Sequence, residues 1–372
     1  MKITIQPYKP GMEKMASRFN QRLEAGRIHF RFPETHQDSW LPAIEGRKIS
    51  REYFLAVENG SEVRGGYILK HQDFLLRGKI YKIGNYQLPL SEGIINRTYS
   101  LVGVQLLADA VKSSPLLFAL GMGGLHQPLP RLLKSSNWTL IEVPFYFRVV
   151  HPGRFLHRIT HLRRSRFRRI LLDTAVVTGL GWIGHKIWTL AKAVRCPRLK
   201  PVSIERIPNF GSWADELWQR CQGNYSFCAV RDAETLNILY PSDEVRFIRL
   251  KIAAWGKPIG WVVLLNTKMS QHKQFGDLQV GSIVDCLALN DYARELIAAA
   301  ADYLKTAKVD LIVTNQSNEM YGAALRASGF LSGPSNFIFA ASRELSRILA
   351  PMELHTAHFH LNRGDGDGPI HL

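Results

Sequence analysis

The sequence predicts an α/β protein made of two similar domains in tandem. Its 372 residues allow about two domains of roughly 150 residues each. Hydrophobic residues make up 46% and charged residues 21% of the chain, which excludes a wholly disordered or collagen-like protein. The same order of elements is expected twice, in residues 1–150 and 203–345: helix, hairpin, strand, helix, strand, short helix, strand. A repeat of domain length is a stronger indication of architecture than a short motif.

The first half alternates helical and strand periodicity. Asn59-Gly60 predicts a tight hairpin turn between its first two strands. The expected strands cover 53–58, 63–70, 79–88, 115–122 and 139–150. The expected helices cover 12–23, 101–112 and 130–136. The second helix would bury Leu101, Val104, Ala108 and Val111.

The second half repeats this pattern, with a turn at Trp255-Gly256-Lys257-Pro258 and a helix capped by Asn290 or Asp291. Its expected helices cover 213–221, 232–239, 291–305 and 319–328. Its expected strands cover 245–254, 259–267, 280–289, 310–314 and 336–341. The predicted organisation is therefore a domain over 1–150, a basic and partly apolar connector over 151–202, a domain over 203–345 and a tail over 346–372.

Several segments resemble the GNAT (GCN5-related N-acetyltransferase) family. YFLAVENGSEVRGGYIL (residues 53–69) resembles the family's central hairpin, and WGKPIGWVVLL (255–265) is its counterpart in the second half. NEMYGAALRASGF (318–330) resembles the family's late helix. The segment 231–237 and the tail RGDGDG (363–368) are similar to tandem GNAT proteins linked to bacterial envelope or exopolysaccharide biosynthesis, in which the tail faces the substrate groove.

The resemblance implies two GNAT-like domains, each a mixed, mostly antiparallel sheet flanked by helices. It also implies acetyl-CoA, or another acyl-CoA, as co-substrate. The expected reaction is N-acyl transfer to an amine of a sugar or other cell-envelope precursor.

Acyl-CoA phosphates bind GNAT proteins at a helix N-terminus, where free amides and the helix dipole attract an anion. The family loop R/Q-x-x-G-x-G/A keeps only Arg97 and Gly103 in the first half. The matching loop of the second half has no glycine, and Asp291 there would repel phosphate. The candidate cofactor-binding residues are Arg97, Gly103 and Asn318, the last of which opens the late-helix motif.

N-acyl transfer needs a base for the amine and an acid for the leaving thiolate. Asp285 lies within an apolar strand, where burial would raise its pKa and suit it as the base. Tyr321 is the candidate acid, and Glu92 is the candidate of the first half. A structural role remains the alternative for each of them.

No metal is expected. His358-x-His360 with Asp365 and Asp367 is the nearest pattern to a metal site, but it lacks the later ligands of a calcium loop.

Positive charge is concentrated in the connector. The chain carries a formal net charge of +17, and residues 151–200 contain twelve Lys or Arg and one Asp. Residues 155–199 also include Trp182 and Trp188, which suit an anionic membrane surface, while their longest uncharged stretch is too short to span a bilayer. Packing between the two domains is the alternative. Nucleic acid is not expected as a partner, because no recognition motif accompanies the charge.

Two other functions remain open. The lost glycines favour a non-catalytic GNAT-fold adaptor that works in polysaccharide assembly at the inner membrane. A Fem-type transferase, which also pairs two GNAT-like domains, would use aminoacyl-tRNA. The N-terminus has no apolar secretory segment, and the four cysteines include no Cys-x-x-Cys pair. We therefore expect a cytoplasmic protein with reduced thiols, placed at the inner membrane surface if the connector binds lipid.

Overall fold

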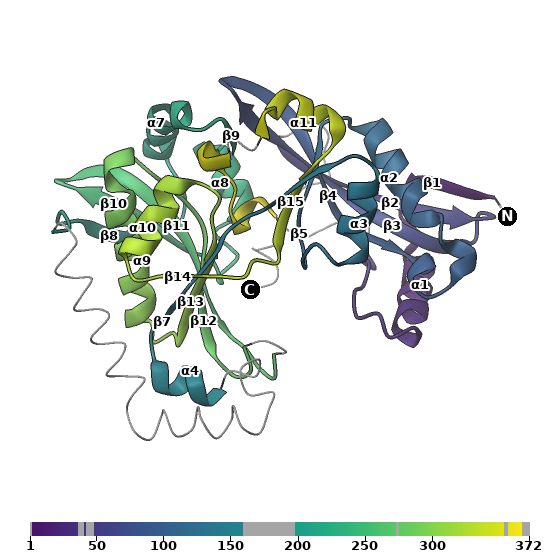
Figure 1. Cartoon of the computed structure of the whole chain (residues 1–372), viewed down its shortest axis with the longest axis horizontal. Coiled ribbons are helices and arrows are strands. Elements are labelled where there is room, and N and C mark those ends of the chain that lie inside the picture. Colours follow the sequence, from purple (N-terminus) through teal and green to yellow (C-terminus); the bar gives the residue numbers. More distant parts are fainter. Residues whose placement is uncertain are drawn as a thin grey trace. The chain divides into compact units, whose positions relative to one another are not determined.

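The computed structural model describes residues 2–35, 41, 48–158, 198–272, 275–352 and 356–366. The chain forms two compact units, each described here by itself (Figure 1). Unit 1 consists of Met1–Glu142, Ser226–Val230 and Asn336–His355. Unit 2 consists of Val143–Tyr225, Arg231–Ser335 and Thr356–Leu372. Neither unit is one continuous stretch of sequence.

The sheet of unit 1 is mixed and mostly antiparallel. Its strand order is β1 (Ile3–Pro7), β2 (Ile49–Glu58), β3 (Glu62–Leu76), β4 (Lys79–Ser91), β5 (Leu117–Met122), β15 (Phe337–Ala341) and β6 (Thr139–Glu142). β9 (Phe227–Ala229) pairs with the end of β3. β4 and β5 form the parallel pair of this sheet.

Helices cover both faces of this sheet. They are α1 (Glu13–Ala25), α2 (Val102–Ser113), α3 (Pro128–Ser135) and α11 (Arg343–Leu349), with 3-10 turns at η1 (Glu92–Ile94) and η2 (Arg97–Tyr99). α2 buries Leu106 and Leu107 against the side chains of one face, and α1 buries Phe19 and Leu23 against the other.

The predicted buried face of α2 is wrong. Leu101, just before the helix, is 68% exposed and Val104 is 47% exposed. The helix turns Val102 and Leu106 inward instead. The segment is apolar on nearly every side, so its periodicity did not identify which face packs.

Unit 2 has the same plan. Its strand order is β14 (Leu331–Gly333), β7 (Phe145–Val149), β13 (Leu311–Asn315), β12 (Gln279–Ala288), β11 (Lys257–Lys268), β10 (Ile248–Ala254) and β8 (Ser203–Arg206). Its helices are α4 (Pro152–Arg158), α7 (Ser212–Cys221), α8 (Ala233–Leu239), α9 (Ala293–Thr306) and α10 (Glu319–Ala327). Shorter elements are η4 (Gln222–Asn224), η5 (Asn290–Tyr292), η6 (Thr356–His358), β16 (Phe359–His360) and η7 (Arg363–Asp365).

The expected cap of α9 is also wrong. Asn290 and Asp291 form the 3-10 turn η5, and the helix starts after Tyr292 without a side-chain cap.

Each half of the sequence contributes a strand to the sheet of the other half. β7 directly follows β6 in sequence, but it pairs with β13 and β14 in unit 2. β15 lies late in the sequence, but it pairs with β5 and β6 in unit 1. The division at residue 150 assigns Phe145–Val149 to the first half, whereas this strand belongs to the sheet of unit 2. Strand periodicity predicts where a strand lies, and it carries no information about which strand will be its partner.

The internal repeat extends to backbone detail. The turn between β2 and β3 holds Asn59 and Gly60 at φ 48° and 77°, and the turn between β10 and β11 holds Trp255 and Gly256 at φ 48° and 76°. β4 and β12 each carry a bulge, at Leu88-Pro89 and at Val284 respectively. These shared irregularities mark the two sheets as copies of one plan.

The strand exchange predicts that neither half of the chain folds when it is produced without the other. A fragment of residues 1–202 lacks β15 and leaves the edges of β5 and β6 unpaired, which favours aggregation. We expect fragments 1–202 and 203–372 to aggregate when produced separately and to form a 1:1 complex when produced together. Size-exclusion chromatography and circular dichroism measure this, and cooperative unfolding of monomeric 1–202 alone would contradict it.

Candidate functional site

Both sheets split open beside their parallel strand pair. In unit 2, β12 and β13 pair only from Val280 to Ser282, and β12 then continues to Ala288 away from β13. In unit 1, β4 and β5 pair only at Gly84 and Asn85, and β4 continues to Ser91. A strand that leaves its partner exposes a row of backbone N–H and C=O groups that need hydrogen bonds.

In unit 2 the chain's own C-terminal segment fills this opening. His360 Nε2 lies 2.8 Å from the carbonyl oxygen of Cys286 on β12. On the other side, Asn362 forms a bridge with Gln316, which follows β13. The backbone N–H of Leu361 donates to the hydroxyl of Ser317. Residues 359–362 therefore occupy the space between the diverging strands and are fully buried.

A buried ionic cluster fixes this segment. The guanidinium of Arg231 donates to Asp285 Oδ1 at 3.0 Å and to both carboxylate oxygens of Asp365 at 2.9 and 3.0 Å. Tyr240 Oη donates to Asp285 Oδ2 at 2.9 Å, and Asn362 Nδ2 donates to Asp285 Oδ1 at 2.6 Å. Asp285, Arg231 and Asp365 are each no more than 2% exposed. Charges this deep are tolerated because each is paired and hydrogen-bonded.

Gly364 shows how closely the segment fits. A methyl group added there would overlap the hydroxyl of Tyr240 and lie 3.1 Å from Asp285 Cβ. The first glycine of RGDGDG is therefore required by packing.

Beside the ionic cluster, the imidazole of His360 is stacked between two phenol rings. Its ring centroid lies 5.0 Å from that of Tyr225 and 4.9 Å from that of Tyr321. Because Nε2 donates to a carbonyl, Nδ1 is the unprotonated nitrogen, and Nδ1 has no hydrogen-bond partner among the described residues. Burial, with the nearby Arg231 charge, lowers the pKa of His360 to about 3.

These contacts define the surroundings of Asp285, Tyr321 and Asn318, the three candidate site residues of the second half. Both carboxylate oxygens of Asp285 accept hydrogen bonds inside the cluster. Tyr321 Oη accepts the N–H of Ala288 at 2.8 Å, and burial raises the pKa of Tyr321 well above its ordinary value. Asn318 caps α10 by accepting the N–H of Met320 at 3.0 Å. The side chains of Asp285 and Tyr321 thus contact the segment in the closed interior, whereas that of Asn318 caps α10.

In unit 1 the edge of β4 beyond Asn85 has no strand of the described residues paired to it on the β5 side. The bulge there places Leu88 at φ 44°, in the left-handed region that a branched residue seldom adopts. Such an irregularity changes the direction of backbone groups along a strand edge. Unit 1 therefore shares the divergence of its parallel strands with unit 2, and among the described residues no strand pairs with β4 there on the β5 side.

Glu92, the candidate of the first half, lies at the end of β4 and is 4% exposed. Arg22 Nε and Arg64 Nη1 donate to its carboxylate, each at 3.0 Å. Arg64 also binds Glu58 at 2.7 Å and lies 4.5 Å above the ring of Tyr99. The hydrogen bond from Arg64 holds the pKa of Glu58 below its ordinary value. Two guanidinium groups thus bind the Glu92 carboxylate, and the network orders the loop between β4 and α2.

The N-terminus of α2 follows this loop. α2 begins without a side-chain cap, so its first amides are available to a ligand. Arg97 is exposed in the preceding turn, and a Cβ on Gly103 would meet no atom closer than 3.9 Å. Arg97 is thus exposed to solvent, and Gly103 has room for a methyl group beside Leu132 and Ser91.

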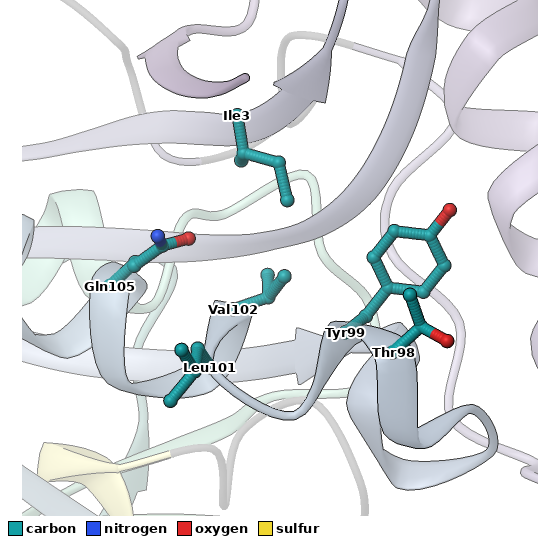
Figure 2. A pocket seen from close by; sticks show the side chains of 6 residues that line it. All are labelled: Ile3, Thr98, Tyr99, Leu101, Val102 and Gln105. Atoms are coloured by element: carbon teal, nitrogen blue, oxygen red, sulfur yellow. The ribbon is translucent and has the colours of Figure 1, made fainter. Parts of the chain in front are cut away.

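A pocket of about 250 Å³ lies against the same helix start. Figure 2 shows Ile3 of β1 on one side of it, with Tyr99 and Val102 from the loop and helix on the other. It is lined by Ile3, Thr98, Tyr99, Leu101, Val102 and Gln105. Neither Arg97 nor a residue of β4 or β5 is among the side chains that line it.

Among the described residues, no group of three potential metal ligands converges. His360 and Asp365, which the sequence pattern offered, bind Cys286 and Arg231 instead. The cysteines of the described part, Cys221, Cys228 and Cys286, are buried free thiols. Within the same ranges, no helix is both long and apolar enough to cross a bilayer. Most of the basic connector, residues 159–197, lies outside the described residues.

Sequence reasoning missed the cluster around Asp285. Its members Arg231, Tyr240 and Asp365 are separated from Asp285 by 45 to 80 positions, and no local pattern links them. The available signals were the polar residues of segment 231–237 and the glycines of the tail, each noted separately.

No model of a known protein family matches the sequence, and no curated protein matches it. Solved structures do share its fold. Saccharomyces cerevisiae N-myristoyltransferase with bound myristoyl-CoA aligns with a TM-score of 0.52 and 10% identity, over 91% of this chain and 82% of that one. A probable N-acyltransferase of Enterococcus faecalis gives 0.53 and 11%, over 94% and 75%. A GCN5-related N-acetyltransferase from Anabaena variabilis gives 0.50 and 8%, over 91% and 72%.

At these identities the similarity shows the fold alone. The chain has two GNAT-like mixed sheets in tandem, each flanked by helices, and the predicted fold class is confirmed.

The ionic cluster predicts a large loss of stability when its cation is removed. Arg231→Met would leave Asp285 and Asp365 buried without their counter-charge, and such losses cost about 3–5 kcal/mol. Chemical denaturation measures the change in the free energy of unfolding. The control Arg347→Met breaks the exposed pair with Glu344 and should cost less than about 1 kcal/mol. If the two substitutions lower the free energy of unfolding equally, the buried cluster contributes no more stability than an exposed ion pair.

His360 predicts a dependence of stability on pH. Its folded pKa of about 3 lies below the unfolded value of 6.5, so the unfolded state binds the proton first and stability falls as pH drops below 6.5. This group alone should remove about 2 kcal/mol between pH 7.5 and pH 5. His360→Gln keeps an N–H donor but cannot titrate, and its loss over this range should be smaller by that amount. If the free energy of unfolding falls equally with pH in the two proteins, the lowered pKa of His360 is contradicted.

Proposed function

We propose that the protein is an acyl-CoA-dependent N-acyltransferase that binds one acyl-CoA, in unit 1. The observation that carries this proposal is the difference between the two openings. In unit 2, His360 and Asn362 of the same chain fill the opening, whereas in unit 1 no strand among the described residues pairs with β4 beyond Asn85 on the β5 side, and the helix that follows β4 starts without a side-chain cap. The same fold in a yeast enzyme whose structure holds myristoyl-CoA adds support.

The residues of unit 1 suit the separate parts of such a ligand. The first amides of α2, with Arg97, would bind phosphate through hydrogen bonds and charge. Beyond its last pair with β5 at Asn85, β4 would offer backbone N–H and C=O groups to the amides of the pantetheine arm. Acyl-CoA, when bound, supplies the thioester that the acceptor amine attacks. A backbone N–H directed at the thioester oxygen would stabilise the negative charge that develops there.

The acceptor we propose is an amine of a sugar or other cell-envelope precursor. This part of the proposal rests on the resemblance of segment 231–237 and of the RGDGDG tail to tandem GNAT proteins of polysaccharide biosynthesis. The buried position of Arg231 and Asp365 assigns both segments a structural role within unit 2, so it adds no contact with an acceptor.

One observation favours the alternative of a non-catalytic adaptor. The phosphate loop of unit 1 lacks the middle glycines that let a backbone approach phosphate closely, and Tyr99 and Ser100 stand in this stretch. An adaptor would keep the fold without binding acyl-CoA, so a binding measurement separates the two functions.

Calorimetric titration with acetyl-CoA tests the proposal. We expect one site per chain, and we expect Arg97→Gln to weaken binding about tenfold because it removes a charged hydrogen-bond donor from the phosphate. The matched control is Arg294→Gln, in the first turn of α9 in unit 2, and it should leave the affinity unchanged.

Two sites per chain, or an effect of Arg294→Gln equal to that of Arg97→Gln, would contradict the assignment to unit 1. Absence of binding at millimolar acetyl-CoA would contradict the enzyme and support the adaptor.

A further inference from the structure

We propose that one corner of unit 2 docks on an anionic lipid bilayer, with Trp255 as its interfacial anchor. The corner is formed by the β10–β11 turn, the edge strand β8 and the residues that lead into β8. Its exposed apolar side chains are Leu199, Ile204 and Trp255. Its exposed cations are Arg198, Lys200 and Lys257. We call this set the β8 corner.

The internal repeat provides the first argument. The turns at Asn59-Gly60 and Trp255-Gly256 have the same φ values, within 1° at each position. This left-handed geometry favours Asn, Asp or Gly, and it is unfavourable for a large aromatic residue. Unit 1 has the favoured residue at this position and unit 2 has the unfavoured one.

Packing does not explain the tryptophan. Its side chain is 73% exposed, the highest value among the described tryptophans and aromatic residues of the fold. A residue that strains the backbone and contributes little burial is retained for a contact outside the fold. Tryptophan is the side chain enriched where hydrocarbon meets lipid head groups.

Neighbouring apolar groups enlarge this surface. Ser203 of β8 pairs with Ala253, two residues before Trp255, and Ile204 pairs with Ile252. Ile204 is 41% exposed and Leu199 is 45% exposed. β8 is the edge strand of its sheet (Figure 1), so this side of the corner has no further strand among the described residues.

The charge of the corner determines the kind of partner. Lys257 directly follows the turn, and Arg198 and Lys200 flank Leu199. The N–H of Lys200 donates to Glu295 at 3.2 Å and its Nζ lies 4.3 Å above the ring of Tyr292, which anchors this stretch on α9. The one acid of β8, Glu205, is paired with Lys251 at 3.2 Å. Apolar side chains ringed by cations fit a surface of anionic lipid rather than a neutral one.

The sequence upstream agrees with this choice. The described chain resumes at Arg198 directly after the basic connector, and residues 151–200 carry twelve cations against one acid. Arg198, Leu199 and Lys200 of the corner are the last residues of this cationic stretch of the sequence.

Co-sedimentation of the full-length protein with vesicles tests the proposal. The vesicles contain phosphatidylcholine alone or phosphatidylcholine with about a third phosphatidylglycerol. Trp255→Asn recreates the dipeptide of the unit 1 turn, so it should fold at least as well as the parent. We expect it to lower partitioning into anionic vesicles several-fold, and we expect Lys257→Gln to lower it about fivefold, the value of one basic residue near an anionic surface.

Two matched controls lie in the same unit and away from the corner. Val245→Ser removes a side chain that is 81% exposed in the loop before β10, at the other end of that strand. Lys305→Gln removes an exposed cation from the far end of α9. Neither should change partitioning.

The proposal is supported if both corner variants lose binding to anionic vesicles and both controls keep it. It is overturned if the corner variants partition like the parent, if all four variants lose binding equally, or if the parent fails to bind anionic vesicles. Loss of binding to a DNA duplex with unchanged vesicle binding would assign the corner to nucleic acid instead. None of these outcomes depends on whether acyl-CoA binds.

Discussion

A sheet that splits beside its parallel strands must satisfy the backbone groups it exposes, and this constraint organises both units. β12 leaves β13 after three residue pairs, and β4 leaves β5 after two. Each divergent strand then presents N–H and C=O groups that are costly to bury without partners. The two units meet this requirement differently. In unit 2, residues 359–365 enter the opening and His360 binds the carbonyl group of Cys286, while Asp285 and Tyr321 accept the N–H groups of Cys286 and Ala288. In unit 1, no strand among the described residues pairs with β4 beyond Asn85 on the β5 side.

The filled opening also explains the buried charges of unit 2. A segment that enters a protein interior brings its polar backbone with it, and here it brings Asn362 and Asp365 as well. Arg231 offsets the charge of Asp365 and, together with Asn362, donates to Oδ1 of Asp285, while Tyr240 donates to Oδ2 of Asp285. The side chains that a sequence reader would assign to proton transfer are therefore the ones that hold the segment in place. A raised pKa of Tyr321 follows from the same burial and keeps its proton on the oxygen.

Sequence patterns predicted the fold well where the information is local. The dipeptide Asn59-Gly60 correctly predicted a turn. The strand and helix periodicities located most elements of both units within a few residues. The exchange of β7 and β15 could not be predicted from the sequence, because the alternation of apolar residues is the same for any partner strand. The buried face of α2 was misjudged because Leu101 and Val104 are as apolar as Val102 and Leu106. For the site, a loop motif predicted Arg97 and Gly103 as cofactor-binding residues, and this role stays a prediction. The contact of Asp285 with Arg231 and Asp365 could not be read from the sequence, since it joins residues 54 and 80 positions apart.

The central claim is that one opening holds a ligand and the other holds the protein's own chain. Hydrogen–deuterium exchange with and without acetyl-CoA tests it most directly, because it locates protection on the backbone. The account predicts new protection in peptides that cover 86–106, from the end of β4 through the start of α2. It also predicts no change in peptides that cover 283–294, whose β12 amides are already enclosed by the C-terminal segment. Protection of 283–294, or protection of both regions alike, would contradict it.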